Sequence, residues 1–180
     1  SDGTWTAPQN ISQSSNVCSE AGIDVYGGKV YATWVEDEAV GKQVYRNTKD
    51  LMSGLWAGKL PCSEIGTNGS LGAYNPFCAS GIAGWVENLD NTTYAVKYLR
   101  PATGSTVQTL YSAAHYQSYP HGVLGSDGST LNAIWTETTI GTPTTGPWIS
   151  EVKYANSAGK KIAYLEVAAG LSVASPYTTY

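Results

Sequence analysis

A pattern of five residues returns three times along this chain at a nearly constant interval, and it restricts the possible folds more than any other feature. The pattern is Ala-x-Trp-x-Glu, and it occupies residues 32–36, 83–87 and 133–137, so that successive tryptophans lie 51 and 50 residues apart. Within each copy the Ala, Trp and Glu alternate with other residues, which places the three side chains on one face of a β-strand. Equal units at an interval of roughly 50 residues indicate a repeat protein.

Each copy lies among further strand-like segments. The turn-forming pairs Gly27-Gly28 and Asp127-Gly128 precede two of the copies, and a segment that ends in Tyr45, Tyr98 or Tyr154 follows each copy. No segment carries the 3.6-residue stripe of an amphipathic helix. We therefore expect four short antiparallel strands in each repeat, and in the first repeat they cover approximately residues 21–26, 29–36, 42–47 and 55–66.

Four-stranded sheets at this period are typical of β-propeller blades. We predict an all-β, propeller-like single domain over residues 1–180, with three four-stranded antiparallel blades and the repeat tryptophans packed between blades. The elements Tyr74-Asn75-Pro76 and Ser118-Tyr119-Pro120 join successive repeats. The repeats cover approximately residues 12–66, 67–117 and 118–170, and residues 1–11 and 171–180 complete neighbouring blades.

Three blades cannot close a ring, because propellers need about four to eight. We expect either that the chain is part of a larger propeller or that it forms half of a six-bladed ring by self-association. An open arc would leave sheet edges and apolar faces uncovered, which favours association.

The composition restricts the setting and the partners. Charged residues make up only 13% of the chain, whereas Tyr occurs 13 times and Trp 6 times. This composition is typical of secreted or cell-surface β proteins. The net charge of −4 and the lack of a basic stripe argue against a nucleic-acid partner, so we expect none. The sequence contains no apolar run of about 18 residues, so we expect no membrane span.

The three cysteines, Cys18, Cys62 and Cys78, lack the spacing of a zinc site. We expect one disulfide or three buried thiols, and the odd number leaves at least one cysteine without a partner in the chain.

Residues 48–56, Thr-Lys-Asp-Leu-Met-Ser-Gly-Leu-Trp, resemble the turn that joins the third and fourth strands of a blade in sialidase-like propellers with Asp-box (BNR-type) repeats. In that family the turn has the pattern Ser-x-Asp-x-Gly-x-x-Trp. Here Thr48 replaces Ser, and two extra residues separate Asp50 from Gly54. Residues 2–5 resemble the shortened end of another copy, whereas residues 101–104 and 156–159 lack both the Asp and the Trp.

The resemblance implies a propeller fold and an extracellular setting. Sialidases of this family bind the substrate carboxylate with three arginines and use a Tyr nucleophile with a Glu base. The chain has only Arg46 and Arg100, so it does not carry a complete site of this kind by itself.

The candidate ligand-binding residues are of three kinds. The repeated carboxylates most simply end their strands in solvent or accept hydrogen bonds from backbone amides. The alternative is acid–base catalysis or calcium binding, and calcium would bind at the acidic run of residues 36–38. An aromatic residue ends the longest loop, residues 138–148, where an exposed ring could stack on a sugar. Two histidines flank residues 116–120, which are rich in Tyr and Pro, and metal binding by this pair is the less favoured interpretation. The residues are Glu36, Glu87, Glu137, Trp148, His115 and His121.

No catalytic constellation is evident, and we predict no resident metal or cofactor, with calcium as the possible exception. The first hypothesis is a non-catalytic propeller module, secreted or on the cell surface, that recognises a glycan or a protein. The second is a part of a larger sialidase-like glycoside hydrolase. The third is a structural domain appended to a secreted enzyme.

Overall fold

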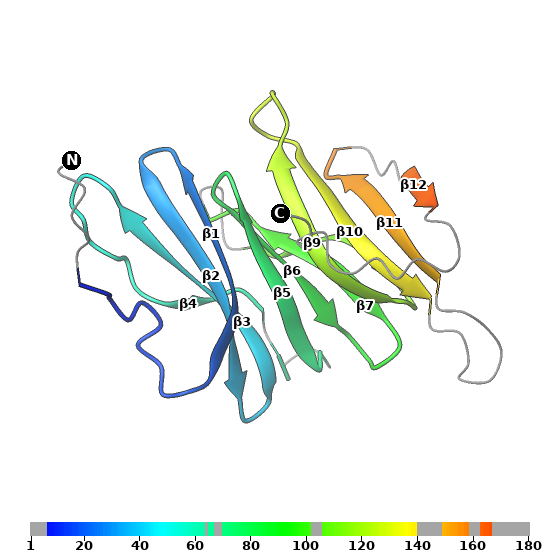
Figure 1. Ribbon diagram of the computed structural model, residues 1–180, viewed down its shortest axis with the longest axis horizontal. Coiled ribbons are helices and arrows are strands. Elements are labelled where there is room, and N and C mark those ends of the chain that lie inside the picture. Colours follow the sequence, from blue (N-terminus) through cyan, green and yellow to red (C-terminus); the bar gives the residue numbers. More distant parts are fainter. Residues whose placement is uncertain are drawn as a thin grey trace.

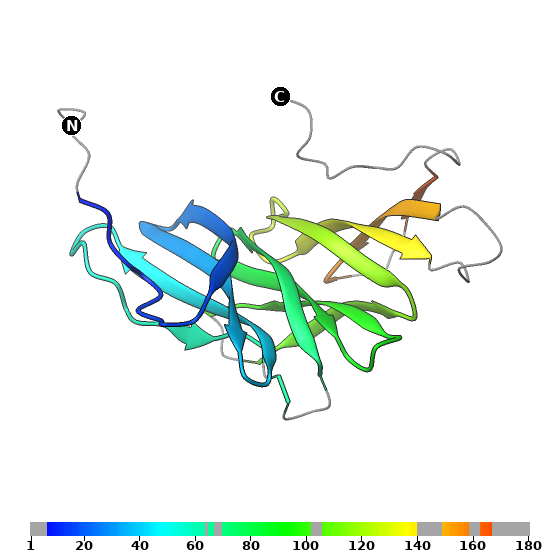
Figure 2. The same cartoon turned by 60° about the horizontal axis from the view of Figure 1, so that its bottom comes forward.

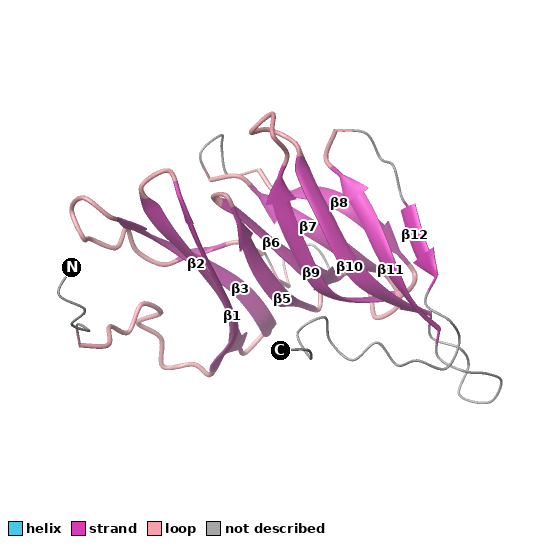
Figure 3. Ribbon diagram, turned by 45° about the horizontal axis from the view of Figure 1, so that its top comes forward, coloured by secondary structure: helices cyan, strands magenta, loops and turns pink. Residues whose placement is uncertain are grey.

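The structure is a computed structural model, and it describes residues 7–63, 65–66, 70–101, 106–139, 149–158 and 163–166. In these residues the chain forms three four-stranded antiparallel sheets that follow one another in sequence (Figure 1). The described residues contain strands, turns and loops but no helix (Figure 3), and thus no helix that could cross a membrane. The prediction of three such sheets is confirmed.

Each sheet is a meander in which consecutive strands pair. The first sheet contains β1 (Cys18–Tyr26), β2 (Lys29–Glu38), β3 (Gly41–Asp50) and β4 (Leu60–Pro61). The second contains β5 (Gly72–Ala79), β6 (Ile82–Asn88), β7 (Tyr94–Leu99) and β8 (Gln108–Ala113). The third contains β9 (Tyr116–Leu124), β10 (Leu131–Thr139), β11 (Ile149–Asn156) and β12 (Ala163–Glu166).

Every Ala-x-Trp-x-Glu unit lies on the second strand of its own sheet, namely β2, β6 or β10. The fourth strand of the first sheet is shorter than expected. Trp56 makes only an isolated bridge with Lys49, and the ladder with β3 is limited to two residues. Gly54 and Gly58 interrupt the segment with positive φ values of 73° and 112°, which a regular strand does not accept.

The three sheets lie side by side, with β1 packed against β5 and β5 against β9, as the two views in Figures 1 and 2 show. We call the face of each sheet that carries the repeat Trp its leading face and the opposite face its trailing face. Trp85 packs with Val35 and Val44 of the first sheet, and Trp135 packs with Val86 and Val96 of the second. Each of these tryptophans therefore fills the junction with the preceding sheet, as the sequence predicted for propeller blades.

In the described residues no sheet precedes the first one, and residues 7–17 lie over the outer part of its leading face instead. The Asn47 side-chain amide donates to the Ile11 carbonyl over 3.2 Å, and the Trp56 indole N–H donates to Gln9 Oε1 over 3.3 Å. Trp34 is therefore buried, with only 4% of its surface exposed.

The strand pairing corrects one sequence alignment. Tyr45, Tyr98 and Tyr154 were expected to be equivalent, but Tyr45 pairs with Trp34, whereas the residues that pair with Trp85 and Trp135 are Lys97 and Lys153. The loops between the second and third strands differ in length, so the sequence alone placed the first repeat out of register by one residue. A shift of one residue in a strand moves a side chain to the opposite face.

Candidate functional site

The first strand of each sheet contains a β-bulge directly opposite the repeat tryptophan. The pairing of β1, β5 and β9 with their neighbours skips two residues, which are Glu20-Ala21, Asn75-Pro76 and Tyr119-Pro120. The first residue of each pair has a left-handed backbone, with φ values of 52°, 47° and 50°. Proline suits the second position because it has no N–H to donate to the ladder. The bulges turn these side chains out of the sheets.

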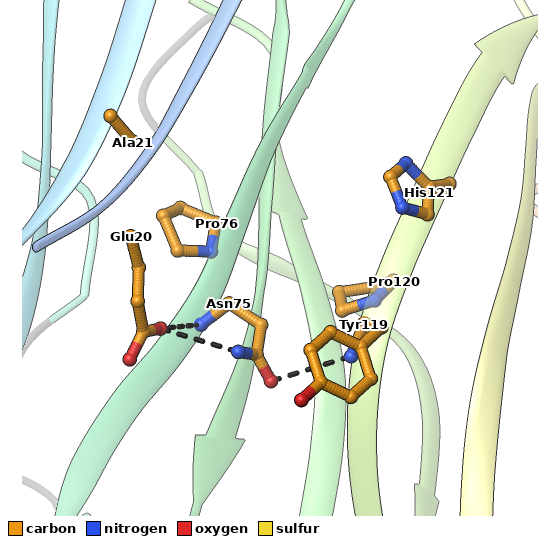
Figure 4. A pocket seen from close by; sticks show the side chains of 7 residues that line it. All are labelled: Glu20, Ala21, Asn75, Pro76, Tyr119, Pro120 and His121. Atoms are coloured by element: carbon orange, nitrogen blue, oxygen red, sulfur yellow. Dashed lines mark hydrogen bonds between the residues drawn. The ribbon is translucent and has the colours of Figure 1, made fainter. Parts of the chain in front are cut away.

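The three bulges meet around one cavity of about 300 Å³ (Figure 4). We call it the bulge cavity, and it is lined by Glu20, Ala21, Asn75, Pro76, Tyr119, Pro120 and His121. Burial lowers the pKa of His121, so its ring is neutral at pH 7 and can both donate and accept a hydrogen bond.

A chain of hydrogen bonds links the bulges across all three sheets, as the dashed lines in Figure 4 show. Glu20 Oε2 accepts the backbone N–H of Asn75 over 2.5 Å and its side-chain amide over 3.3 Å. Asn75 Oδ1 in turn accepts the backbone N–H of Tyr119 over 3.3 Å. At both steps the bulge side chain of one sheet binds the bulge backbone of the next sheet, which fixes the shape of the cavity.

Tyrosines gather beside the cavity. The rings of Tyr94 and Tyr116 meet edge to face at 5.2 Å, and Tyr116 and Tyr119 are each 41% exposed. Burial raises the pKa of Tyr116, and the negative charges of Tyr119, Tyr94, Glu20 and Tyr74 would add to the rise.

The sequence led us to expect that the repeated glutamates end their strands in solvent, but the structure buries all three. Glu36, Glu87 and Glu137 are buried, with 0%, 4% and 3% of their surfaces exposed. In the first two sheets the carboxylate accepts the indole N–H of the repeat Trp, over 2.7 Å from Trp34 and 2.9 Å from Trp85. The two-residue spacing on one strand face brings the two side chains together.

A lysine completes this unit in every sheet. Lys97 Nζ lies 2.6 Å from Glu87, and Lys153 Nζ lies 3.3 Å from Glu137. In the first sheet Tyr45 occupies the equivalent lysine position, and Lys59, from the segment before β4, lies 3.0 Å from Glu36 and 4.5 Å from the centre of the Tyr45 ring. The glutamates are thus already paired by the scaffold, and their predicted ligand-binding role stays a prediction.

The third sheet departs from this arrangement. Glu137 Oε1 contacts His115 Nδ1 at 3.2 Å, whereas buried Trp135 Nε1 and Glu137 Oε2 have no hydrogen-bond partner among the described atoms. His115 therefore contacts Glu137, whereas His121 lines the bulge cavity. Among the residues that the structure describes, no group of three His, Cys, Asp or Glu side chains could hold a metal ion.

The acidic run at residues 36–38 does not converge on one point. Glu36 is held by Trp34 and Lys59, Asp37 pairs with Lys42 at 2.8 Å, and Glu38 accepts the Tyr45 hydroxyl. Burial by itself would raise the pKa of Glu36, but hydrogen bonds from Trp34, Ser14 and Lys59 outweigh burial and lower it.

Two other expectations have different outcomes. Trp148 lies outside the described residues, so its predicted sugar contact stays a prediction. All three cysteines are free thiols, and Cys18 is exposed while Cys62 is buried, so neither one disulfide nor three buried thiols describes them.

Sequence reasoning missed Glu20, Asn75 and Tyr119 as site residues. The Asn75-Pro76 and Tyr119-Pro120 pairs were noted as recurring elements between repeats, but the structure places them inside β5 and β9. A proline within a strand-like run is a signal for a bulge, and it could have located two of the three positions.

Comparison with known proteins leaves the family open. No family model and no curated protein matches the sequence. Two solved structures are similar at low identity. An acylaminoacyl peptidase from Pyrococcus horikoshii has a TM-score of 0.46 and 9% identity over 81% of this chain and 25% of its own. The β-propeller domain of the trilobed protease from Pyrococcus furiosus has a TM-score of 0.38 and 7% identity over 84% of this chain and 59% of its own. The chain thus spans less than two thirds of either structure.

Proposed function

We propose that this chain is a non-catalytic, extracellular recognition module with a propeller-like fold, and that it binds a neutral glycan at the bulge cavity. The observation that carries the proposal is the convergence of three bulges on one hollow that offers an amide, a carboxylate, an imidazole and a phenol beside exposed tyrosine rings. A cavity of about 300 Å³ is within the size range of small-ligand sites.

These groups match the chemistry of sugars. Sugar hydroxyls both donate and accept hydrogen bonds, so they can pair with Glu20, Asn75 and neutral His121 in the same site. Sugar C–H faces stack on aromatic rings, and Tyr119 offers such a ring at the edge of the cavity.

The charges favour a neutral ligand over an acidic one. Glu20 is the charged side chain of the cavity lining. Both arginines of the chain lie elsewhere: Arg46 is beside Thr33 and Asn47 in the first sheet, and Arg100 donates to the carbonyl of Ser129. A carboxylate sugar such as sialic acid would therefore meet repulsion rather than a guanidinium fork.

The repeated glutamates support binding rather than hydrolysis. A glycosidase general acid needs a raised pKa, whereas the hydrogen bonds of Glu36 lower its pKa. Each of the three carboxylates also has a lysine partner, which ties it to the scaffold.

The proposal is tested by titrating the protein with neutral and sialylated oligosaccharides by calorimetry. We expect binding to neutral glycans, and a loss of at least about tenfold in affinity in Tyr119→Asn. Asn accepts the left-handed backbone at this position, so the variant removes the ring without adding strain. Tyr26→Ala is the matched control, because Tyr26 is also exposed, at 47%, and lies at the far end of β1.

Equal affinities in the wild type and Tyr119→Asn would refute the site. If Trp148→Ala abolished binding and Tyr119→Asn did not, the ligand would bind at the 138–148 loop instead of the cavity. A preference for sialylated ligands would contradict the argument from charge.

A further inference from the structure

Among the described residues, nothing covers Val123 and Ile134 on the trailing face of the third sheet, although the fold covers the same face of the second sheet. On the second sheet Phe77, Ala79 and Tyr98 are 5%, 4% and 5% exposed, because they pack with Leu131 of the third sheet. In the third sheet the residues at the positions of Ala79 and Gly84 are Val123 and Ile134. They are 61% and 45% exposed, so an apolar surface that is buried at one junction is open at the next.

The first sheet has the complementary opening. Residues 7–17 cover Trp34 but leave Ile23 and Val25 of β1 73% and 60% exposed. Ile23 pairs with Ala32 and Val25 with Val30, so both point to the leading face. An apolar groove of about 450 Å³ runs between β1 and residues 9–12 on this face.

Both junctions inside the molecule have the same polarity. The leading face of the second sheet packs on the trailing face of the first, and the leading face of the third packs on the trailing face of the second. Among the described residues, the chain therefore carries an exposed apolar patch on a face of each kind: Ile23 and Val25 on the leading face of the first sheet, and Val123 and Ile134 on the trailing face of the third.

We propose that the trailing face of the third sheet is the docking surface for the first sheet of a second copy of this chain, and that two copies close head to tail into a ring of six sheets. The new junction keeps the polarity of the two junctions inside the molecule, but β1, rather than the covered Trp34, supplies the contact on the leading face. Six sheets are within the range of about four to eight that closes a propeller. Each copy contributes both faces, so the two junctions of the ring are equivalent.

Sedimentation equilibrium of the full chain tests the pairing. We expect a concentration-dependent rise to twice the chain mass of 19.0 kDa. Val123→Lys and Ile23→Lys each place a charge at a proposed junction, and each should raise the dissociation constant at least about tenfold. Met52→Lys is the control, because Met52 is 98% exposed in the turn after β3 and should leave association unchanged. Circular dichroism of each variant verifies that the strands still form.

A mixing experiment tests the head-to-tail polarity. Each lysine variant by itself spoils both junctions of the ring, whereas a mixture of the two variants keeps one junction intact. We therefore expect the mixture to regain pairing that neither variant shows alone. A wild-type chain that stays at 19.0 kDa at every concentration would overturn the proposal. So would unchanged pairing in Val123→Lys, or a mixture that pairs no better than its components.

Discussion

At the scale of single residues, the unit that recurs most consistently is a tryptophan, a buried glutamate and a lysine on the leading face of each sheet. Its first copy shows how much the lysine matters. Tyr45 replaces the lysine on β3, and Lys59 restores the positive charge from another part of the chain. A buried carboxylate without a cation would be destabilising, so the compensation has a physical cause.

The unit predicts the effect of neutralising one carboxylate. Glu87→Gln should lower the free energy of unfolding by about 2–3 kcal/mol, because it leaves Lys97 beside Trp85 without a counter-charge. The value is below the full range for a buried pair, since the Lys97 side chain is 19% exposed. Asp37→Asn is the control in urea unfolding: its pair with Lys42 is exposed, and we expect a loss below about 1 kcal/mol. Similar losses in both variants would contradict the scaffold role.

The cysteines predict a simple labelling pattern. Burial raises the pKa of Cys62 to about 12 and of Cys78 to about 11, so both remain thiols at pH 8. Cys18 is exposed. A thiol reagent such as DTNB should modify one group per chain rapidly, and Cys18→Ser should remove that fast phase. Two or three fast groups in the folded protein would show that the sheets do not pack as described.

At the scale of elements, packing between sheets depends on glycines that accept a phenyl ring. The Phe77 ring lies against Gly84, its cross-strand partner, and against Gly122 of β9, and a Cβ at either glycine would overlap it. We expect Gly122→Ala to destabilise the protein by about 1–3 kcal/mol. Phe77→Leu should recover part of that loss in the double variant. Strictly additive losses in thermal unfolding would contradict the contact.

The loop between β6 and β7 predicts acid sensitivity. Asp90 accepts the Thr92 hydroxyl and the backbone N–H groups of Thr92 and Thr93, and these bonds lower its pKa to about 2. The folded pKa is below the value of about 3.9 in an unfolded chain. The stabilisation is therefore complete above about pH 4 and is lost as the pH falls toward 2. Urea midpoints measured across this range should fall less steeply in Asp90→Asn; an unchanged slope would refute the linkage.

The elements also show what the sequence can and cannot predict. The strands around Trp34, Trp85 and Trp135 were predictable, because alternation and turn residues are local signals. The bulge cavity was not, because it depends on three strands that are 44 to 55 residues apart meeting in space. Nothing local marks Glu20 as a left-handed residue, whereas Asn or Gly would have done so.

The buried pairs were only partly predictable. The repeat indicated that the glutamates are equivalent, but strand alternation alone does not tell which face another sheet will cover. The role of Lys59 could not be read from the sequence. The other two sheets carry the equivalent lysine on their third strand, whereas Lys59 lies before β4 and Tyr45 occupies the third-strand position. The register of Tyr45 was wrong by one residue, since the hairpin loops vary in length.

At the scale of the whole molecule, three sheets, one from each repeat, lie side by side (Figure 1). Their first strands converge on the bulge cavity (Figure 4). The proposed glycan site depends on this convergence, because it needs side chains from three sheets at one point. The proposed ring depends on the side-by-side order of the sheets, because it needs a junction that repeats with constant polarity.

The most direct measurement is a nuclear Overhauser spectrum of the isotope-labelled protein at the three bulges. We expect cross-peaks from the Asn75 backbone N–H to the Glu20 side chain, and from the Tyr119 backbone N–H to the Asn75 side chain. Each of these cross-peaks would connect residues of two different sheets, which no strand pairing joins. Cross-peaks from these two amides only to residues within their own sheets would show that the first strands do not converge.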